Sequence, residues 1–301
     1  MSQLVQLVRA VKKKADKTTL SHWYASPQDI ELPDIASSRV ITQSQFQAIL
    51  RRFNTVHQWG HNHVHPCFAQ FLGLGQHIQT LAHTRSPFPL MGLVHTDNVI
   101  TTHTPLTPDE TTIACHFHDI RQHARGITVD IDISARQAGR LCVHARSTYL
   151  YRTGLSDSTL AINGQSTETQ PGVLLSRIAE LTFKQNAGRQ YARISGDYNP
   201  IHLSDWSARL LGFKKMMAHG THVLARTLTA LEDAHHLFCA PTVVKNQFMY
   251  PASLPSSTTL NCSAPAENAD PLFFELCNLN ASRRKQCVLT GNISLRPPNV
   301  N

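Results

Sequence analysis

The sequence lacks any long hydrophobic run. No stretch approaches the roughly 18 apolar residues that a membrane-spanning helix needs. The first residues, MSQLVQLVRAVKKKADK, lack the apolar core and small-residue cleavage site of a secretory signal. We therefore expect a soluble, cytoplasmic protein with no membrane span.

Paired cysteine motifs are also missing. The chain has seven cysteines, an odd number, and no C-x-x-C pair. This pattern argues against both a disulfide framework and a cysteine-based zinc site. We expect reduced thiols that lie mostly in the core.

Acidic residues are scarce relative to basic ones. Asp and Glu number 20 against 28 Lys and Arg, which gives a net charge of +8. An excess of this sign suits an anionic partner, such as nucleic acid, a membrane surface or a phosphorylated cofactor like coenzyme A. Only 16% of residues are charged, and no nucleic-acid-binding motif or long basic run with interleaved aromatics is present. We expect no nucleic-acid partner.

The length of 301 residues and the 41% hydrophobic content allow two modest domains. Residues 1–35 predict a peripheral N-terminal extension, with a short amphipathic helix and a loop but no evident chemistry. Residues 36–155 and 172–301 each predict an apolar helix followed by several strands, and a polar linker separates them. The pattern alone predicts the α+β class. The predicted helices cover 40–53, 66–84, 205–212 and 220–231, and the predicted strands 98–103, 111–121, 126–134, 140–151, 242–248, 258–263, 272–279 and 285–295.

A cluster of histidines lies between the helices predicted over 40–53 and 66–84. His61, His63 and His65 alternate, so they would share one side of an extended segment, as metal ligands can. No Asp, Glu or Cys lies in the cluster, and the chain uses 18 histidines throughout. We therefore favour an ordinary connector and expect no metal site.

The densest set of polar groups lies between Ser195 and His202. Within eight residues the chain places a hydroxyl, a carboxylate (Asp197), an amide (Asn199) and an imidazole, and the Gly and Pro among them favour a tight turn. His219 and Gly220 follow, where an apolar helix is predicted to begin.

These residues resemble the signature of the MaoC-like (R)-specific enoyl-CoA hydratases, Y/F-A-x-x-S-G-D-x-N-P-x-H followed by H-G, at every position. The resemblance covers about residues 183–231. It implies a double hot-dog fold in which two antiparallel sheets each wrap a central helix. It also implies that residues 36–155 are a degenerate first half on the acyl-chain side, and that residues 172–301 are the catalytic half.

The implied reaction is the reversible hydration of trans-2-enoyl thioesters to (R)-3-hydroxyacyl thioesters. It uses no metal or redox cofactor, and coenzyme A or the pantetheine of an acyl carrier protein is part of the substrate. The protein would be a monomer or a homodimer, because a double hot-dog can do within one chain what single-domain relatives do by pairing.

The chemistry assigns a role to each residue of the turn. Asp197 and His202 would handle the water, Asn199 would hold their geometry, and Ser195 would support the turn. The division of proton transfer between Asp197 and His202 stays open, because their titrations can be coupled. A simpler alternative is that these groups only make Asx turns and caps.

Gly220 completes the predicted site. Its backbone N–H would lie at the N-terminus of an apolar helix, where it can stabilise the thioester oxyanion. His219 is expected to be structural.

Two further groups of residues are expected to bind the rest of the substrate. Lys214, Lys215 and Lys245 are candidates for the phosphates of coenzyme A or of a carrier protein, and solvated surface lysines are the equal alternative. Gly73 and Gly75, on the helix of the first half, are candidates for giving a long acyl chain room.

Other functions remain open at this stage. A 3-hydroxyacyl-carrier-protein dehydratase of fatty-acid or polyketide synthesis would use the same chemistry. A non-catalytic acyl-thioester-binding protein would keep the shape, but it has no need of the Asp197 and His202 pair. A thioesterase is less favoured because the motif is that of the hydratases.

Overall fold

The ten strands of the described residues form one antiparallel sheet. A computed structural model describes residues 13–153, 173–264, 271–279 and 286–295. The strand order is β1-β3-β4-β5-β2-β7-β10-β9-β8-β6. The strands are β1 (Ala36–Ile41), β2 (Leu93–Thr102), β3 (Thr111–His123), β4 (Gly126–Gln137), β5 (Arg140–Arg152), β6 (Ser176–Phe183), β7 (Thr242–Phe248), β8 (Ser256–Cys262), β9 (Leu272–Asn278) and β10 (Cys287–Ser294).

The junction between β2 and β7 joins the two halves. These strands pair antiparallel from Asp97 opposite Gln247 to Thr102 opposite Thr242. The sequence predicted two separate sheets, and the structure corrects this detail. Strand edges carry unpaired N–H and C=O groups, so pairing β2 with β7 satisfies both edges and makes one continuous surface.

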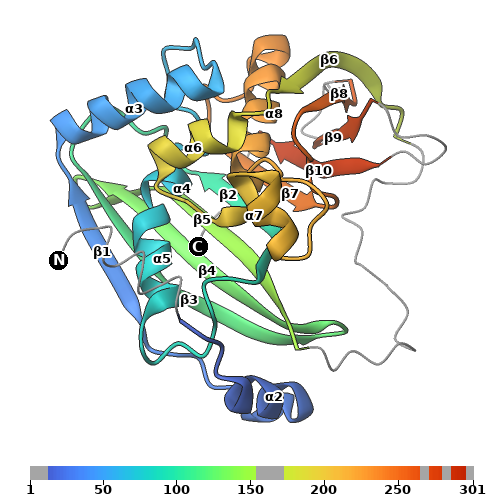
Figure 1. Ribbon diagram of the computed structural model, residues 1–301. Helices are drawn as coiled ribbons and strands as arrows, with labels where there is room; N and C mark the ends of the chain where they lie inside the picture. Colours follow the sequence, from blue (N-terminus) through green and yellow to red (C-terminus); the bar gives the residue numbers. More distant parts are fainter. Residues whose placement is uncertain (1–12, 154–172, 265–270, 280–285, 296–301) are drawn as a thin grey trace.

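The helices lie mainly over one face of this sheet (Figure 1). In the first half, α4 packs on β4 and β5, and α5 packs on β1 and β3. In the second half, α8 packs on β6, and α3 contacts both α6 and α8. The helices are α2 (Lys17–Ala25), α3 (Gln43–His57), α4 (Phe68–Leu72), α5 (Leu74–Ala82), α6 (Ala187–Ser195), α7 (Asp205–Leu210) and α8 (Gly220–His235), with 3-10 turns η1 (Pro27–Asp29) and η2 (Pro200–His202).

The helix predicted over 66–84 is divided in two at Gly73. A Cβ atom there would lie 2.7 Å from the Ile133 side chain on β4, so only glycine allows the helix to lie this close to the sheet. Gly73 therefore leaves no space for an acyl chain, contrary to the sequence prediction. Gly75 differs, because nothing lies within 4 Å of a Cβ built at that position.

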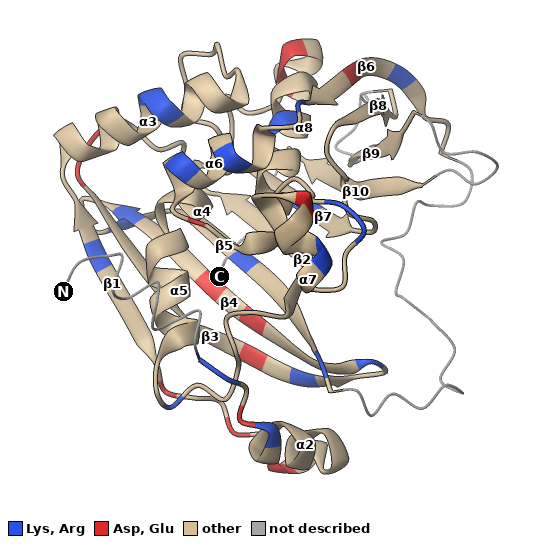
Figure 2. Ribbon diagram, in the orientation of Figure 1, with Lys and Arg blue, Asp and Glu red and all other residues tan. Residues whose placement is uncertain are grey.

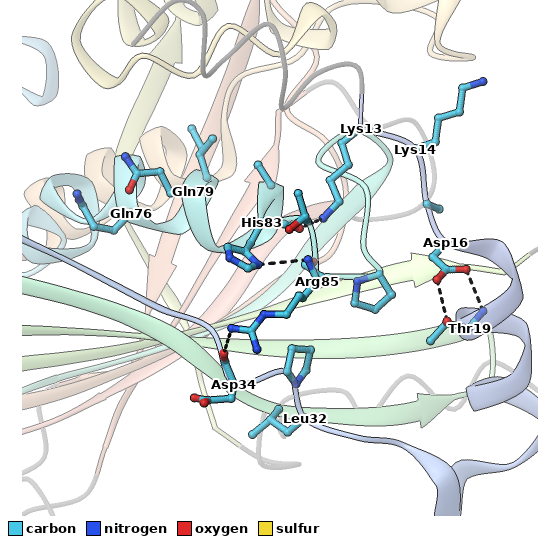
Figure 3. Close-up of a pocket in the computed structure, with 18 of the residues that line it drawn as sticks. Lys13, Lys14, Asp16, Thr19, Leu32, Asp34, Gln76, Gln79, His83 and Arg85 are labelled. Atoms are coloured by element: carbon cyan, nitrogen blue, oxygen red, sulfur yellow. Dashed lines mark hydrogen bonds between the residues drawn. The ribbon is translucent and has the colours of Figure 1, made fainter. Parts of the chain in front are cut away.

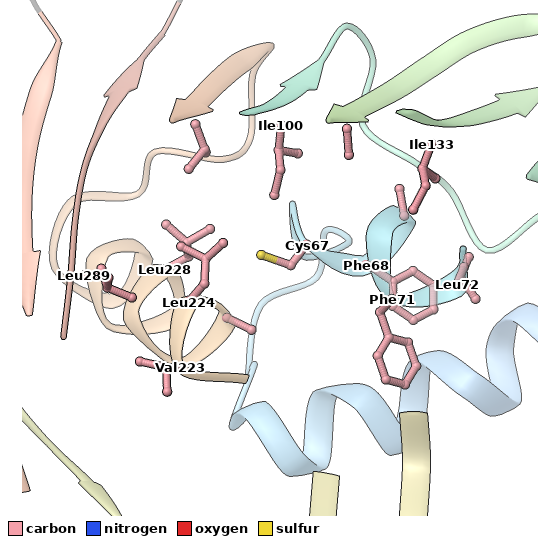
Figure 4. Packing of buried hydrophobic residues seen from close by; sticks show 14 of the residues in the cluster. Cys67, Phe68, Phe71, Leu72, Ile100, Ile133, Val223, Leu224, Leu228 and Leu289 are labelled. Atoms are coloured by element: carbon pink, nitrogen blue, oxygen red, sulfur yellow. The ribbon is translucent and has the colours of Figure 1, made fainter. Parts of the chain in front are cut away.

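The core runs between α4 and α8. Figure 4 shows Phe68 and Phe71 of α4 on one side and Leu224 and Leu228 of α8 on the other, with Cys67 between them. Phe68, Leu224 and Leu228 have no exposed surface. Burying each such side chain contributes about 1.5 to 3 kcal/mol, so this packing helps to hold the two halves together.

Three features differ from the sequence prediction. The strands β1 and β6 were not predicted, and most of β1 is exposed, so it lacks a clear alternation of buried and exposed residues. The extension was expected to be peripheral, yet its described part buries Leu20 and Trp23 in the core. The Trp23 ring lies 6.5 Å from that of Phe88.

Within the described ranges, no helix has the length and apolar character required to cross a membrane.

Candidate active site

The signature segment folds as a chain of short hydrogen-bonded turns. The helix α6 ends at Ser195, and Gly196 follows with φ of +76°, a conformation that glycine adopts without strain. The Ser195 hydroxyl accepts a hydrogen bond from the Asp197 N–H at 3.1 Å. Asp197 Oδ1 accepts from the Asn199 N–H at 3.1 Å, and Asn199 Oδ1 accepts from the Ile201 N–H at 3.4 Å. Ser195 and Asn199 thus shape the backbone that carries Asp197 and His202.

A second glycine lets this turn lie against α6. A Cβ atom on Gly188 would stand 2.1 Å from the His202 carbonyl oxygen, which no side chain can tolerate. The sequence analysis did not single out Gly188. The need for glycine at this position becomes evident only once the turn is known to fold back on the helix before it.

The environment of His202 fixes its protonation. The ring is buried, and Nδ1 lies 2.8 Å from the Met217 carbonyl oxygen. A carbonyl can only accept, so Nδ1 carries the proton and Nε2 has a free lone pair. Burial lowers the pKa of His202, and the charge of Asp197 opposes this shift. His202 is therefore neutral at pH 7 and able to take a proton.

His219 lies directly on this imidazole. The two rings stack with centroids 3.7 Å apart. His219 Nε2 donates to the Asp197 main-chain oxygen at 3.0 Å and lies 3.8 Å from Asp197 Oδ2. Burial keeps the pKa of His219 well below its usual value, so this ring is neutral too. The sequence analysis treated His219 as structural, and it does hold the turn, but it also forms one wall around the acid/base pair.

Gly220 begins α8 immediately after His219. No side chain caps this helix, so its first N–H groups have no capping partner and its dipole presents partial positive charge. A Cβ on Gly220 would lie 3.1 Å from the Phe248 ring. Gly220 therefore lies next to the histidine pair, and the Phe248 ring packs against its Cα.

The first half reaches this site from the other side. The Phe248 ring lies 4.8 Å from His95 on β2, and His95 stacks on Tyr149 of β5 at 4.5 Å. Burial raises the pKa of Tyr149, and the charge of Asp197 adds to that rise, so the phenol keeps its proton. The sequence analysis assigned no role to His95 or Tyr149. Neither residue carries a local signal, because their role depends on the pairing of β2 with β7.

A cleft of about 1590 Å³ opens beside the signature turn. Ser195, Gly196 and Tyr198 line one side, and Gly75 of α5 lies on another. Figure 3 shows the remaining walls, with Lys13 and Lys14 before α2, Gln76 and Gln79 on α5, and His83 and Arg85 after it. Lys13 Nζ donates to the Leu81 carbonyl oxygen at 2.8 Å. The N-terminal extension thus helps to build the cleft.

The three predicted phosphate ligands do not lie on one side of the sheet. Lys214 and Lys215 are exposed in the segment between α7 and α8. Figure 2 shows basic residues there and along α3 and α6. Lys245 is exposed on β7, three residues before Phe248, so its side chain points to the opposite face from the ring that covers Gly220. Lys245 is thus a poor partner for the other two.

The ligand atoms of Asp197, His202 and His219 lie within 4.8 Å of one another, close enough to share an ion. Hydrogen bonds occupy Nδ1 of His202 and Nε2 of His219. Within the described residues, His202 Nε2 and His219 Nδ1 have no hydrogen bond of this kind, and the Asp197 side chain is 34% exposed. The same arrangement serves proton transfer without a metal.

Residues 164–262 match the model of the MaoC-like domain. The chain is also similar to 3-hydroxyacyl-thioester dehydratase X of Mycobacterium tuberculosis, with 31% identity over 149 residues. This alignment covers 48% of the present chain and 51% of the dehydratase, so the chain matches about half the length of this curated relative.

Solved structures extend the similarity to both halves. The crystal structure of HtdX from Mycobacterium tuberculosis superposes with a TM-score of 0.69 and 22% identity, covering 86% of this chain and 99% of that one. A double hot-dog protein of the same organism superposes with a TM-score of 0.53 and 12% identity, covering 89% and 97%. At these identities the comparisons establish the fold, and they confirm the predicted double hot-dog.

Proposed function

We propose, from the match of residues 164–262 to the MaoC-like domain, that the chain is a hydro-lyase of the MaoC-like dehydratase family. Its reaction would be the reversible hydration of trans-2-enoyl thioesters to (R)-3-hydroxyacyl thioesters. The observation that carries the proposal is the meeting of a neutral His202, the Asp197 carboxylate and the uncapped N-terminus of α8 at Gly220. A protein that only binds acyl thioesters has no need of this acid/base pair.

The proton path follows from the tautomer of His202. In the hydration direction, Nε2 accepts a proton from water as the water oxygen adds to C3. The imidazolium then returns a proton to C2, so the product gains one water and the side chain ends as it began. The Asp197 carboxylate accepts a hydrogen bond from the same water and stabilises the transient imidazolium, in line with its effect on the His202 pKa.

The N-terminus of α8 handles the second charge. Addition to C3 moves negative charge onto the thioester oxygen, and the Gly220 N–H would donate to it. One such donor contributes about 3 to 4 kcal/mol to transition-state stabilisation.

The direct test follows the conjugated thioester absorbance of enoyl-CoA substrates of several lengths. We expect wild type to hydrate them, and Asp197→Asn and His202→Ala to lose about 100- to 10,000-fold in kcat. His116→Ala, an exposed histidine on β3, is the matched control and should retain full activity. Wild type that is inactive on all enoyl-CoA lengths and on carrier-bound enoyl groups would refute the proposal, and a merely binding protein would then be the better account.

The thioester carrier is the finer part of the proposal. Coenzyme A or the pantetheine of an acyl carrier protein would enter as part of the substrate, without a separate cofactor. Lys214 and Lys215 are exposed beside the segment that leads to Gly220, so they are well placed for a phosphate at the open end. High salt, or the double change Lys214→Ala and Lys215→Ala, should raise KM and leave kcat nearly unchanged. Comparing KM for the two carriers then identifies the one these lysines serve.

A further inference from the structure

The histidine-rich connection after α3 lies against the end of α8 (Figure 1). His65 Nε2 lies 3.0 Å from the Ala225 carbonyl oxygen, and the Thr229 hydroxyl donates to the His57 carbonyl oxygen at 3.2 Å. These contacts bring His61 and His63 to a part of the chain about 170 residues away. The acidic and thiol groups that the local sequence lacks are found there.

Two sets of ligand-type atoms converge at this place. His63, Glu232 and Cys239 form one set, and His61, Glu232 and His236 form the other, with all atoms of each set within 4.8 Å of one another. Glu232 is common to both. Imidazole nitrogen, carboxylate oxygen and thiolate sulfur are the donors that zinc takes in proteins.

The carboxyl group of Glu232 is buried. Its side chain has no exposed surface. Oε2 accepts a hydrogen bond from the Phe238 N–H at 2.9 Å, and within the described residues no Lys or Arg forms an ion pair with it. A buried carboxylate is costly unless it is paired or coordinates a metal ion.

The side chains of His63, Glu232 and Cys239 approach one another closely. His63 Nε2 and Glu232 Oε1 lie 3.0 Å apart, and neither atom has another partner within the described residues. Tetrahedral zinc, with bonds to nitrogen and oxygen near 2.0 to 2.1 Å, separates two such ligands by about 3.3 Å. Cys239 Sγ lies 3.7 Å from His63 Nδ1, and one ligand atom from each of the three residues lies within 4.8 Å of the other two, so a zinc ion at this place requires the His63 ring to reorient.

Neighbouring groups hold the histidines in place. The Trp59 indole N–H donates to the His63 carbonyl oxygen at 2.7 Å. His61 Nε2 lies 2.8 Å from Asp233 Oδ1, the carboxylate contact that commonly orients a metal-bound imidazole through its far nitrogen. His61 Nδ1 then remains for the ion.

We propose that Glu232, His63 and Cys239 bind a zinc ion, with the fourth position open to His61, His236 or solvent. The ion neutralises the buried carboxylate and ties the connection after α3 to the end of α8. It thereby joins the first half to the second at a site separate from Asp197 and His202. The sequence predicted no metal here because it considered ligands from the local segment alone.

The test measures zinc binding to the full chain after dialysis against a chelator. Titration calorimetry should show one tight zinc site in wild type, and Glu232→Gln should weaken it by at least about 100-fold, more than loss of an orienting partner costs. Cobalt in the same site should give a thiolate charge-transfer band that Cys239→Ser abolishes. Asp197→Asn is the control for the other convergent cluster and should keep both signals.

Thermal unfolding guards against a folding defect in the variants. Zinc should raise the Tm of wild type and of Asp197→Asn but not that of Glu232→Gln. Both Glu232→Gln and Cys239→Ser should keep hydratase activity if that proposal holds, so the two proposals fail separately. Equal zinc affinity in Glu232→Gln and wild type, absence of a stoichiometric site, or loss of binding in Asp197→Asn alone would each overturn the inference.

Discussion

The Nδ1 proton of His202 is donated to the main-chain oxygen of Met217, at 2.8 Å, and this contact decides which nitrogen faces the substrate. Met217 lies just before the histidine and glycine that begin α8. The same short segment therefore orients the proposed base and leads to the proposed oxyanion donor. A shift of this segment would disturb both steps together.

The pH dependence of kcat/KM follows from the state of His202. Hydration requires the neutral ring, so the rate should fall as pH decreases through the pKa of His202. Burial lowers that pKa, which places the acid limb below the ordinary histidine value of 6.5. The charge of Asp197 raises the same pKa, so in Asp197→Asn the residual activity should show an acid limb at still lower pH. An acid limb above 6.5 in wild type would contradict this account.

Gly75 should control the length of the acyl chain that the cleft accepts. It lines the cleft, and nothing lies within 4 Å of a Cβ at this position. Gly75→Leu should leave Tm nearly unchanged and lower kcat/KM for long-chain enoyl-CoA relative to a four-carbon substrate. Rates across a series of chain lengths measure the ratio.

Gly73→Ala is the matched comparison for this experiment. Its Cβ would meet Ile133 at 2.7 Å, so we expect a loss of about 1 to 3 kcal/mol in the free energy of unfolding and no change in chain-length preference. An unaltered preference in Gly75→Leu would show that the acyl chain lies elsewhere.

Mild acid should destabilise the protein because several histidines are buried in neutral form. Burial lowers the pKa of His57 and of His77 to about 3, and that of His95 to about 4. The unfolded chain binds protons near 6.5 and the folded one does not, so stability is full above that value and is lost as pH falls toward 4 and then 3. Each such group removes up to about 1.4 kcal/mol per pH unit in this window.

Urea unfolding between pH 7 and pH 5 measures this effect. His77→Phe keeps the contact with the Tyr149 ring and removes one titrating group, so its stability should fall less steeply with pH than that of wild type. Parallel slopes for the two proteins would show that His77 does not contribute.

Cys277 and Cys287 should form a disulfide when the protein is oxidised. They lie opposite each other on β9 and β10, with sulfur atoms 2.7 Å apart. Hydrogen bonding from Cys277, together with burial, raises the pKa of Cys287, so the thiolate is scarce and the reaction should be slow at neutral pH. After treatment with a mild oxidant, the number of titratable thiols in the unfolded chain should fall from seven to five. Cys287→Ser should show no such bridge.

The sequence predicted most of the second half because its signals are local. The strand predicted over 242–248 has the same bounds in the structure, and the helix predicted at Gly220 begins there. The turn around Asp197 was also predicted as irregular, since Gly196 and Pro200 act on their immediate neighbours. Strands β1 and β6 gave no such signal, because edge strands with exposed residues do not alternate clearly.

Residues that meet across the fold could not be predicted in this way. Tyr149 and His95 reach the site only because β2 pairs with β7. Glu232 meets His63 only because the end of α8 packs against a distant connection. In each case the residues come together because two segments far apart in sequence lie close in space. The periodicity and spacing of a sequence do not predict such distances.

The continuous sheet has a consequence for how the two halves can change. In a symmetric dimer of single hot-dogs, every substitution appears on both sides of the shared site. Here β2 always pairs with β7 of the same chain, so each half meets one fixed and different neighbour. A substitution that improves acid/base chemistry in one half is therefore not repeated in the other half. The two surfaces of the site can evolve separately.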